Sequence, residues 1–484
     1  MAGYIRYQEK NGALYASFIV GKRVGGKKVN ETTNLGRVID KERRVFRNRK
    51  QGIFTFTPES GVRHLPGVPE TGIYDFGNAY VYSKVIENSG LSAILRDVFG
   101  TDYDTVSAMM FYRTLQGGAN SGAVDWYEGS WAKSLFPNAG LQSQRLSEFF
   151  ERIGNERVTQ RFFKAYLPFA KCSNAILIDS TGLPNAIDMP LTAISNHGGQ
   201  VSEETRYILV HDKETNLPIY YRYVAGNIVD VSTMATTLRE LEAYGTHIDY
   251  ALLDAGYCSE NNIFQLYSDN IRFVTRLGRN RKLYNTLCDN YLPTLQDVEN
   301  LVRYRERLVY IRRVETSLYG NDGYAYVALD FDRRNSQFKK YMLEELSAGE
   351  KTREELAAEC INMGVFILIS SERLDIKDIL PLYYKRQAIE QMFDISKNCA
   401  DILPLRTHNE ATFRGHLLLS FITMAGYSLA DKLLVNTRYS LSAALAVLRN
   451  LKIKVYPTTT VVQEPTKKIK DISAMLNVPI PATV

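Results

Sequence analysis

The chain has few of the residues that commonly build zinc sites or disulfide frameworks. Its 484 residues include only five cysteines and six histidines. No cysteines show C-x2-C spacing, and no histidines form an H-x3-H or H-E-x2-H pattern. Neither a transition-metal ligand set nor a disulfide framework is therefore indicated. If a metal ion takes part in the chemistry of this protein, carboxylates must hold it.

Long apolar segments are also missing. The longest uncharged apolar run, residues 417–430, is too short to span a bilayer and predicts a buried helix. Arg6, Glu9 and Lys10 interrupt any early apolar segment, so no signal peptide is predicted. A composition of 45% hydrophobic and 23% charged residues is typical of a globular protein of several domains. We therefore expect a cytoplasmic protein that makes no membrane contact.

Positive charge is concentrated at the N-terminus. Thirteen Lys and Arg against four Asp and Glu give residues 1–50 a charge of +9, and because the whole chain carries +6, the remainder carries −3. Alternating apolar and polar residues around Gly25 and Gly26 predict a small antiparallel sheet, followed by a short basic helix from about Asp40. Such a module is typical of a nucleic-acid contact dominated by phosphates, with a merely solvated surface as the alternative. The candidate DNA-binding cations are Lys22, Arg23, Lys27, Lys28, Arg43, Arg44 and Arg47.

Two acidic residues follow patterns of buried strands. Residues 175–178 are all apolar and lead to Asp179, and residues 250–253 lead to Asp254 in a similar local context. Continuous apolar runs predict central strands, whose ends expose functional groups. A single Asp at a strand end is more often a cap or turn residue, so the prediction of a site depends on these two acids together with a third.

The third acid lies in a polar stripe between Tyr383 and Lys397. At about 100° per helical residue, Tyr383, Arg386, Glu390 and Lys397 fall on one narrow face of a helix whose opposite face is apolar. The alternative is a solvated surface on which Arg386 and Glu390 form an ordinary i,i+4 ion pair. The spacing Tyr-x2-Arg-x3-Glu-x6-Lys, however, resembles the signature of bacterial DDE transposases of the insertion sequence four group and its relatives.

This resemblance covers residues 175–276 and 364–430 with specific motifs, including Ala-Gly-Tyr after Asp254. It implies an α/β ribonuclease H-like catalytic core interrupted by a β-rich insertion, with an N-terminal small β module and an all-helical DNA-binding region. It also implies two Mg²⁺ ions, with Mn²⁺ as a substitute, because such ions favour carboxylate oxygens. The implied catalytic residues and metal ligands are Asp179, Asp254 and Glu390. The implied contacts to the DNA backbone are Tyr383, Arg386 and Lys397.

The predicted organisation has seven segments. They are a basic small-sheet DNA-binding module (1–52), a linker (53–78), a helical DNA-binding domain (79–172), the first part of the catalytic core (173–277), the insertion (278–363), the second part of the core (364–410) and a C-terminal helical region suited to dimerisation (411–484). Related transposases use a β-rich insertion to shape DNA hairpins, in some members through a tryptophan. This insertion has no tryptophan, but any of its tyrosines could stack on a base.

The predicted function is that of a transposase. It would bind the terminal inverted repeats of an insertion sequence and catalyse Mg-dependent DNA cleavage and strand transfer by a cut-and-paste mechanism. The sequence leaves open whether the cleaved ends form hairpins. The expected partners are double-stranded DNA, as terminal repeats and target, and a second copy of the chain in a synaptic complex at a bacterial or archaeal nucleoid. The alternatives are a catalytically silent, transposase-derived DNA-binding protein and a metal-dependent nuclease without strand transfer.

Overall fold

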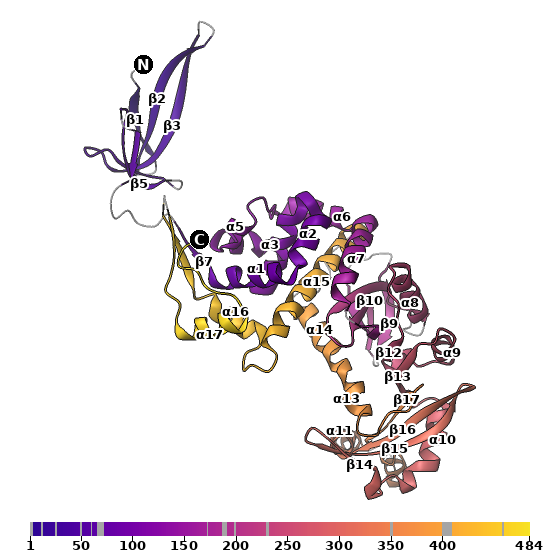
Figure 1. Cartoon of the computed structure of the whole chain (residues 1–484). Helices are drawn as coiled ribbons and strands as arrows, with labels where there is room; N and C mark the ends of the chain where they lie inside the picture. Colours follow the sequence, from indigo (N-terminus) through magenta and orange to yellow (C-terminus); the bar gives the residue numbers. More distant parts are fainter. Residues whose placement is uncertain are drawn as a thin grey trace.

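A computed structural model covers the chain (Figure 1). The described residues are 3–10, 13–24, 27–48, 51–59, 61–64, 72–171, 173–185, 191–197, 200–228, 232–348, 352–398, 409–456 and 459–484. Helices and strands alternate through most of the chain, and the predicted mixed α/β architecture is confirmed. One large hydrophobic core and one small separate core hold the described elements together.

The small core belongs to an N-terminal module, a six-stranded antiparallel sheet that stands at one end of the molecule in Figure 1. Ala16, Leu35, Phe46 and Phe54 are its most buried residues. Because side chains alternate between the faces of a strand, the sheet has one apolar face and one open, polar face. Its strands are β1 (Tyr4–Lys10), β2 (Ala13–Val24), β3 (Lys27–Asp40), β4 (Val45–Asn48), β5 (Gly52–Thr57) and β6 (Gly61–His64).

Two predictions for this region were wrong. The short basic helix expected from Asp40 is a turn, because Asp40 Oδ1 accepts the Arg43 N–H at 2.9 Å and Arg44 is left-handed with φ 53°. Strand β4 then begins at once. The expected linker, residues 53–78, contains β5 and β6 of the same sheet and the strand β7 (Gly72–Asp75), so most of its described residues form strands rather than a connection without structure.

Seven helices follow β7, in the region where helices were predicted. Close packing of this bundle on the later helix α15 (Glu410–Asp431) uses two glycines, since a Cβ on Gly415 would meet the backbone of Phe150, and one on Gly154 would meet the backbone of Ala411. The helices are α1 (Gly77–Ser89), α2 (Leu91–Phe99), α3 (Tyr103–Leu115), α4 (Ala123–Gly129), α5 (Ala132–Leu135), α6 (Ser143–Ile153) and α7 (Glu156–Ala170).

Helix α15 runs diagonally between the helical region and the large sheet in Figure 1. By length and composition, Glu410–Leu434 is apolar enough to cross a membrane, but 78% of its most apolar window is buried inside the protein. Each of its buried Leu and Phe side chains contributes roughly 1.5–3 kcal/mol to folding. His416 on this helix packs in the core as predicted, with Nδ1 3.1 Å from Arg113.

The C-terminal region returns to the helical region through a small sheet. Strand β18 (Lys452–Val455) pairs with both β7 and β19 (Thr460–Val462), so residues far apart in sequence share one three-stranded sheet. The helices α16 (Leu441–Leu448) and α17 (Lys467–Met475) lie beside it (Figure 1). Ser440 caps α16, where a helix was predicted, whereas β18, β19 and α17 were not predicted.

The large sheet contains ten strands, and five of them form its catalytic half. Their order is β11-β10-β8-β12-β13; β10 is antiparallel to both its neighbours, whereas β8, β12 and β13 run parallel to one another. Strand β9 (Ala193–His197) pairs with β10 at one side. The five strands are β8 (Ala175–Pro184), β10 (Gln200–Asp212), β11 (Pro218–Ala225), β12 (Tyr250–Leu253) and β13 (Arg272–Leu277).

Helices cover both faces of this half. On one face α8 (Met234–Ala243) packs against β11, where Tyr220 donates to Glu240 at 2.9 Å. On the other face lie α14 (Gln387–Asn398) and α15, whose Phe421 ring is 5.3 Å from that of Tyr221. The side chain of Ser259 caps the next helix, α9 (Glu260–Ser268). Asp230 precedes α8 in the sequence and is of a residue type that favours helix caps, but it lies outside the described residues.

The predicted insertion continues the same sheet. Strand β17 (Val365–Ser370) pairs with β13 on one side and with β16 on the other, so β17 and the three insertion strands together extend the core by four positions. The charged segment 337–360 falls in two helices, α11 and α12. The remaining elements are α10 (Lys282–Tyr291), β14 (Leu301–Tyr304), β15 (Arg307–Leu318), β16 (Asn321–Asp330), α11 (Phe331–Ala348) and α12 (Arg353–Cys360).

His211, near the end of β10, makes folding sensitive to acid. It is fully buried with Nδ1 3.0 Å from the Asn216 carbonyl oxygen, and burial lowers its pKa to about 4. Between pH 4 and 6.5 the unfolded state binds the extra proton, so stability rises with pH across this window. Acidification from pH 7 to pH 4 should cost roughly 3 kcal/mol through this residue.

Urea unfolding at both pH values should show this loss in the wild type and a smaller one in His211→Gln. His247→Gln, which replaces an exposed imidazole, is the matched control and should keep the wild-type difference. Equal pH dependence in wild type and His211→Gln would contradict the assignment.

Candidate active site

Register brings Asp179 and Asp254 side by side. Strands β8 and β12 are parallel, and their last pair is Ile178 with Leu253, so each Asp follows directly. β12 ends there, but β8 continues to Pro184. The prediction that Asp179 marks a strand end was therefore wrong: it lies within β8, at the level where its neighbour ends, and this opens space above its side chain.

The Tyr383–Lys397 stripe does not lie on one regular helix. It comprises α13 (Ile379–Tyr383), a 3₁₀ turn η7 (Tyr384–Arg386) and α14, which follow one another without interruption. Pro381 lies in the first turn of α13, where its missing N–H is not needed. The tighter turn changes the angular positions assumed for a regular helix. The apolar back is nevertheless buried, as predicted, at Ile389, Met392 and Phe393.

Arg386 brings these elements together. Its guanidinium lies 2.9 Å from Asp179 Oδ2, 3.1 Å from Asp254 Oδ1 and 3.6 Å from Glu390 Oε1. It also donates to the Tyr383 hydroxyl at 3.1 Å. The ordinary i,i+4 pair considered for Arg386 and Glu390 is thus one part of a cluster in which one cation contacts three carboxylates from three separate elements.

Burial differs strongly within this cluster. Asp179 and Arg386 are 8% and 9% exposed, whereas the side chains of Asp254 and Glu390 are 38% and 60% exposed. Burial raises the pKa of Asp179, and the nearby Arg386 opposes this only in part. Burial disfavours the charge of Arg386 as well, but Asp179, Tyr383 and Asp254 outweigh it and raise the Arg386 pKa. The outer two carboxylates face solvent and are accessible to a substrate.

The three carboxylates are chemically suited to a divalent cation, but their present spacing is not suited to hold one. Carboxylate oxygens are the ligands that Mg²⁺ prefers. Among the described side chains, no group of three acids, histidines or cysteines is arranged to hold a metal ion, because the guanidinium occupies the space between the carboxylates. The buried Nε of Arg386 has no hydrogen-bond partner there, so this position leaves one of its donors unsatisfied. A metal ion at these residues requires the guanidinium to withdraw.

Lys397 and three residues that were not predicted complete the site. Lys397 Nζ donates to Thr181 Oγ1 at 3.0 Å, the Ser180 N–H donates to Asp179 Oδ1 at 2.8 Å, and Thr275 Oγ1 donates to the Asp254 carbonyl oxygen at 3.0 Å. Thr181 could have been found from the sequence, because side chains two residues apart in a strand share a face. Thr275 belongs to another strand and gave no such signal.

The exposed surface of Tyr383 and Arg386 is small. Tyr383 is 6% exposed, and burial raises its pKa to about 12 against the opposing effect of Arg386. Both side chains point to the carboxylates in this arrangement, whereas Lys397 is only half-buried. Of the four side chains in the stripe, only those of Lys397 and Glu390 expose substantial surface. The prediction that the whole stripe contacts DNA therefore needs revision.

The N-terminal cations occupy several parts of the small sheet. Arg43 and Arg44 are exposed in the turn before β4, and Arg47 is exposed on β4 itself. Lys22, near the end of β2, forms an ion pair with Glu31. The side chains of Arg23, Lys27 and Lys28, at the tip of the β2-β3 hairpin, lie outside the described residues.

The insertion tyrosines fall into two groups. Tyr284, Tyr304 and Tyr326 are buried and unsuited to stacking on a base, and Tyr304 instead stacks on Tyr384 of η7 at 5.1 Å. Arg307 lies over both of these rings, which connects the insertion to the turn that carries Arg386. The half-buried tyrosines of the insertion are Tyr291, Tyr310, Tyr319, Tyr324 and Tyr341.

The fold and the cluster define a mixed α/β protein with a three-carboxylate site. A family model described as "Transposase DDE domain" matches residues 171–425, more than half of the chain. The chain therefore belongs to the DDE transposase family, a family of enzymes that act on DNA and generally use divalent metal ions. The matched region contains all three acids.

Among solved structures, the chain resembles one described as "Cryo-EM structure of piggyBac transposase synaptic complex with hairpin DNA (SNHP)", with 10% identity and a TM-score of 0.38. The match covers 66% of this chain and 58% of that chain, so this chain spans less than two thirds of that transposase. A likeness of this size is too small to support an argument about the site. Comparison with curated protein sequences gave no match.

Proposed function

We propose that this protein is a cut-and-paste transposase of the insertion sequence four group, with Asp179, Asp254 and Glu390 as its catalytic acids. The observation that carries the proposal is their convergence on one guanidinium from β8, the end of β12 and α14. The strand order β11-β10-β8-β12-β13, with only β10 reversed, supports a ribonuclease H-like core. An ordinary surface would not gather three acids whose positions, from Asp179 to Glu390, span more than 200 residues of the sequence.

The proposed chemistry assigns a role to each acid. Two Mg²⁺ ions, or Mn²⁺ in their place, would activate the attacking oxygen and stabilise the leaving one. Asp179 would be a ligand of both ions, since it is the most buried acid and lies between the end of β12 and α14. Asp254 and Glu390 would each complete the ligands of one ion. Arg386 holds the carboxylates in place until then, and Lys397 is positioned by Thr181 to meet a DNA phosphate.

The direct experiment uses a duplex that carries the repeats flanking the gene of this protein, a target plasmid and Mg²⁺. Cleaved ends joined to the target would support transposition, and hairpin ends would show which cleavage route is followed. Cleavage without joining would indicate the nuclease alternative. Binding without cleavage would indicate a silent DNA-binding protein.

The small sheet is the proposed DNA-binding module. The arrangement of cations on its open face supports this proposal. Register places Gln8, Tyr15, Arg37 and Arg47 in one row across β1, β2, β3 and β4, so their side chains share a face. The two arginines are direct cross-strand neighbours, which is unfavourable for like charges. Both are exposed, and within the described part of the chain neither has a carboxylate partner. A DNA phosphate between them would relieve the repulsion.

Replacing Arg37 and Arg47 together with Gln should weaken binding to a labelled repeat duplex about tenfold at moderate salt. It should also reduce the slope of log affinity against log salt concentration by about 2, since each phosphate contact contributes about 0.9. Fluorescence anisotropy over a salt series measures both. Lys432→Gln with Lys454→Gln, two exposed cations outside the segments expected to bind DNA, is the matched control. An equal slope in the two double variants would refute the proposed face.

We further propose that the active species is a homodimer on DNA in a synaptic complex, in a bacterial or archaeal cytoplasm at the nucleoid. The C-terminal region was expected to supply the dimer contact. Helix α15 is enclosed by the helical region and the sheet, and its residues 415–428 are buried. A contact from this region would therefore fall to α16 and α17.

A further inference from the structure

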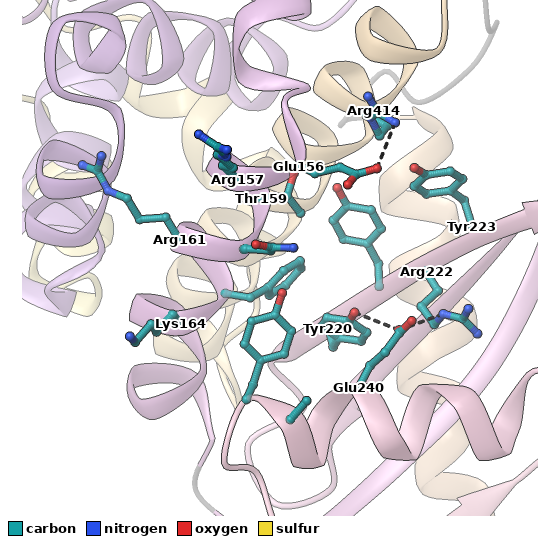
Figure 2. A pocket seen from close by; sticks show the side chains of 15 residues that line it. Glu156, Arg157, Thr159, Arg161, Lys164, Tyr220, Arg222, Tyr223, Glu240 and Arg414 are labelled. Atoms are coloured by element: carbon teal, nitrogen blue, oxygen red, sulfur yellow. Dashed lines mark hydrogen bonds and ion pairs between the residues drawn. The ribbon is translucent and has the colours of Figure 1, made fainter.

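A groove along the outer edge of the large sheet has no role in the site described above. It lies between α7 and the edge strand β11, with α8 below and Arg414 of α15 at one end (Figure 2). Its volume is about 890 Å³. The lining is unusual in that aromatic rings form its inner part and cations lie along its rim.

The inner part is a cluster of rings. Phe163 of α7 lies 4.6 Å from Tyr220 and 6.1 Å from Tyr244 between ring centroids. Tyr220 and Phe163 are buried, whereas Tyr223 and Tyr244 are only half-buried and keep part of their surface open to the groove. Partly exposed rings on a fixed aromatic base offer a stacking surface for a planar ligand.

The far wall is held rigid by internal ion pairs. Glu240 accepts from Tyr220 at 2.9 Å and pairs with Arg222 at 2.8 Å, and Arg414 lies 3.4 Å from Glu156 (Figure 2). The charges of Arg222 and Arg414 are thereby largely neutralised. These pairs position the rings but contribute little net charge to a ligand.

The rim differs because its cations lack acidic partners. Arg157, Arg161 and Lys164 of α7, the α7 cations, are exposed, and among the described residues none forms an ion pair, although Arg161 donates to the carbonyl oxygen of Asp97. They project from α7 on the outer side of the rings in Figure 2. Their spacing of four and three residues places them along one side of the helix over about 10 Å. A row of this kind suits successive phosphates of one strand.

The groove lies level with the catalytic cluster. Register pairs Asp179 with Leu209 and Leu209 with Tyr221, so these three residues form one row across β8, β10 and β11. Two strand spacings separate the ends of this row, or about 10 Å. Leu209 and Tyr221 are buried beneath α15, so this row gives the separation between the catalytic acids and the groove and not an open path along the sheet.

We propose that this groove binds an unpaired segment of a DNA strand, with its phosphates along the α7 cations and a base against the two half-buried tyrosines. An unpaired strand is required because only an unpaired base exposes the face that stacks on such a ring. The identity of the ligand as DNA rests on the proposed function. The site itself is separate from the catalytic acids and from the N-terminal module.

The test measures binding of labelled oligothymidylate to the full-length protein by anisotropy over a salt series. Arg161→Gln with Lys164→Gln should weaken binding about tenfold and lower the salt slope by about 1.4, since each single-strand phosphate contributes about 0.7. Tyr244→Ala should also weaken binding about tenfold, whereas Tyr244→Phe, which keeps the ring, should bind as the wild type. Thermal unfolding of each variant checks that it is folded.

Lys432→Gln with Lys454→Gln is the charge-matched control and should leave oligothymidylate binding unchanged. Unchanged binding in both groove variants would overturn the inference, as would equal losses in Tyr244→Ala and Tyr244→Phe. Competition by thymidine monophosphate at equal nucleotide concentration would show a mononucleotide site and would also overturn it. Because cleavage of the repeat duplex is scored separately, failure of the groove and failure of the transposase proposal give different results.

Discussion

Replacing Glu390 with Gln should reduce DNA cleavage at least about 10³-fold while DNA affinity stays within about twofold of the wild type. Glu390 is the most exposed acid of the cluster, so its amide fits the same space without a cavity. The change removes one anionic oxygen ligand but no contact that the proposed DNA-binding surfaces use. Cleavage of the labelled repeat duplex in Mg²⁺ and anisotropy in its absence measure the two effects.

The matched control is Asp394→Asn. Asp394 lies one turn further along α14, is exposed, and is outside the catalytic cluster. The Asp394→Asn variant should cleave DNA as the wild type does. Equal cleavage by Glu390→Gln and the wild type would remove Glu390 from the mechanism, and a parallel loss of DNA binding would mean that its role had been misassigned.

Replacing Arg386 with Met should destabilise the folded protein by about 3–5 kcal/mol, because it leaves the buried carboxylate of Asp179 without its cation. Asp179 is 8% exposed and lies 2.9 Å from the guanidinium. Urea unfolding measures the loss. Addition of Mg²⁺ should restore part of the stability in the variant and less in the wild type, because the variant's carboxylates are no longer occupied.

Two controls isolate the charge effect. Lys385→Met removes the neighbouring exposed cation, whose nearest acid is Glu214 at 3.6 Å, and should cost less than about 1 kcal/mol. Asp179→Asn combined with Arg386→Met should recover much of the lost stability, since the unpaired buried charge is then absent. Equal losses for Lys385→Met and Arg386→Met, or no recovery in the double variant, would show that Arg386 does not neutralise Asp179.

Buried strands were the part of the fold most readily predicted. The start of β8 and the whole of β12 were predicted, because residues 175–178 and 250–253 are short, continuously apolar runs. Their order in the sheet could not be predicted, since register depends on pairing between distant segments, such as Val274 with Ser370. That pairing makes the insertion an extension of the core sheet, which no local pattern indicates.

The candidate site was predicted as a set of residues but not as an arrangement. Asp179, Asp254 and Glu390 could be named from local sequence and family resemblance. The central position of Arg386 could not, because it depends on the 3₁₀ turn at 384–386 and on the register of β8 with β12. The groove was missed entirely, since its cations lie on α7 and its tyrosines on β11 and α8.

The N-terminal errors have a common cause. Charge density suggested a helix at Asp40 and composition suggested a linker beyond residue 52, but neither property reports strand pairing. Phe46 is buried against Phe54 of the neighbouring strand, a contact between strands that outweighs the local helical preference.

The continuity of the ten-stranded sheet has a mechanical consequence. β12, β13, β17 and β16 share one ladder of hydrogen bonds, so the insertion cannot swing on a hinge relative to Asp254 without breaking backbone pairs. Amide protons on these four strands should consequently exchange with solvent as one cooperative unit. DNA bound by the insertion would be held at a fixed angle to the catalytic acids. Any opening for product release must then come from the helices that cover the sheet.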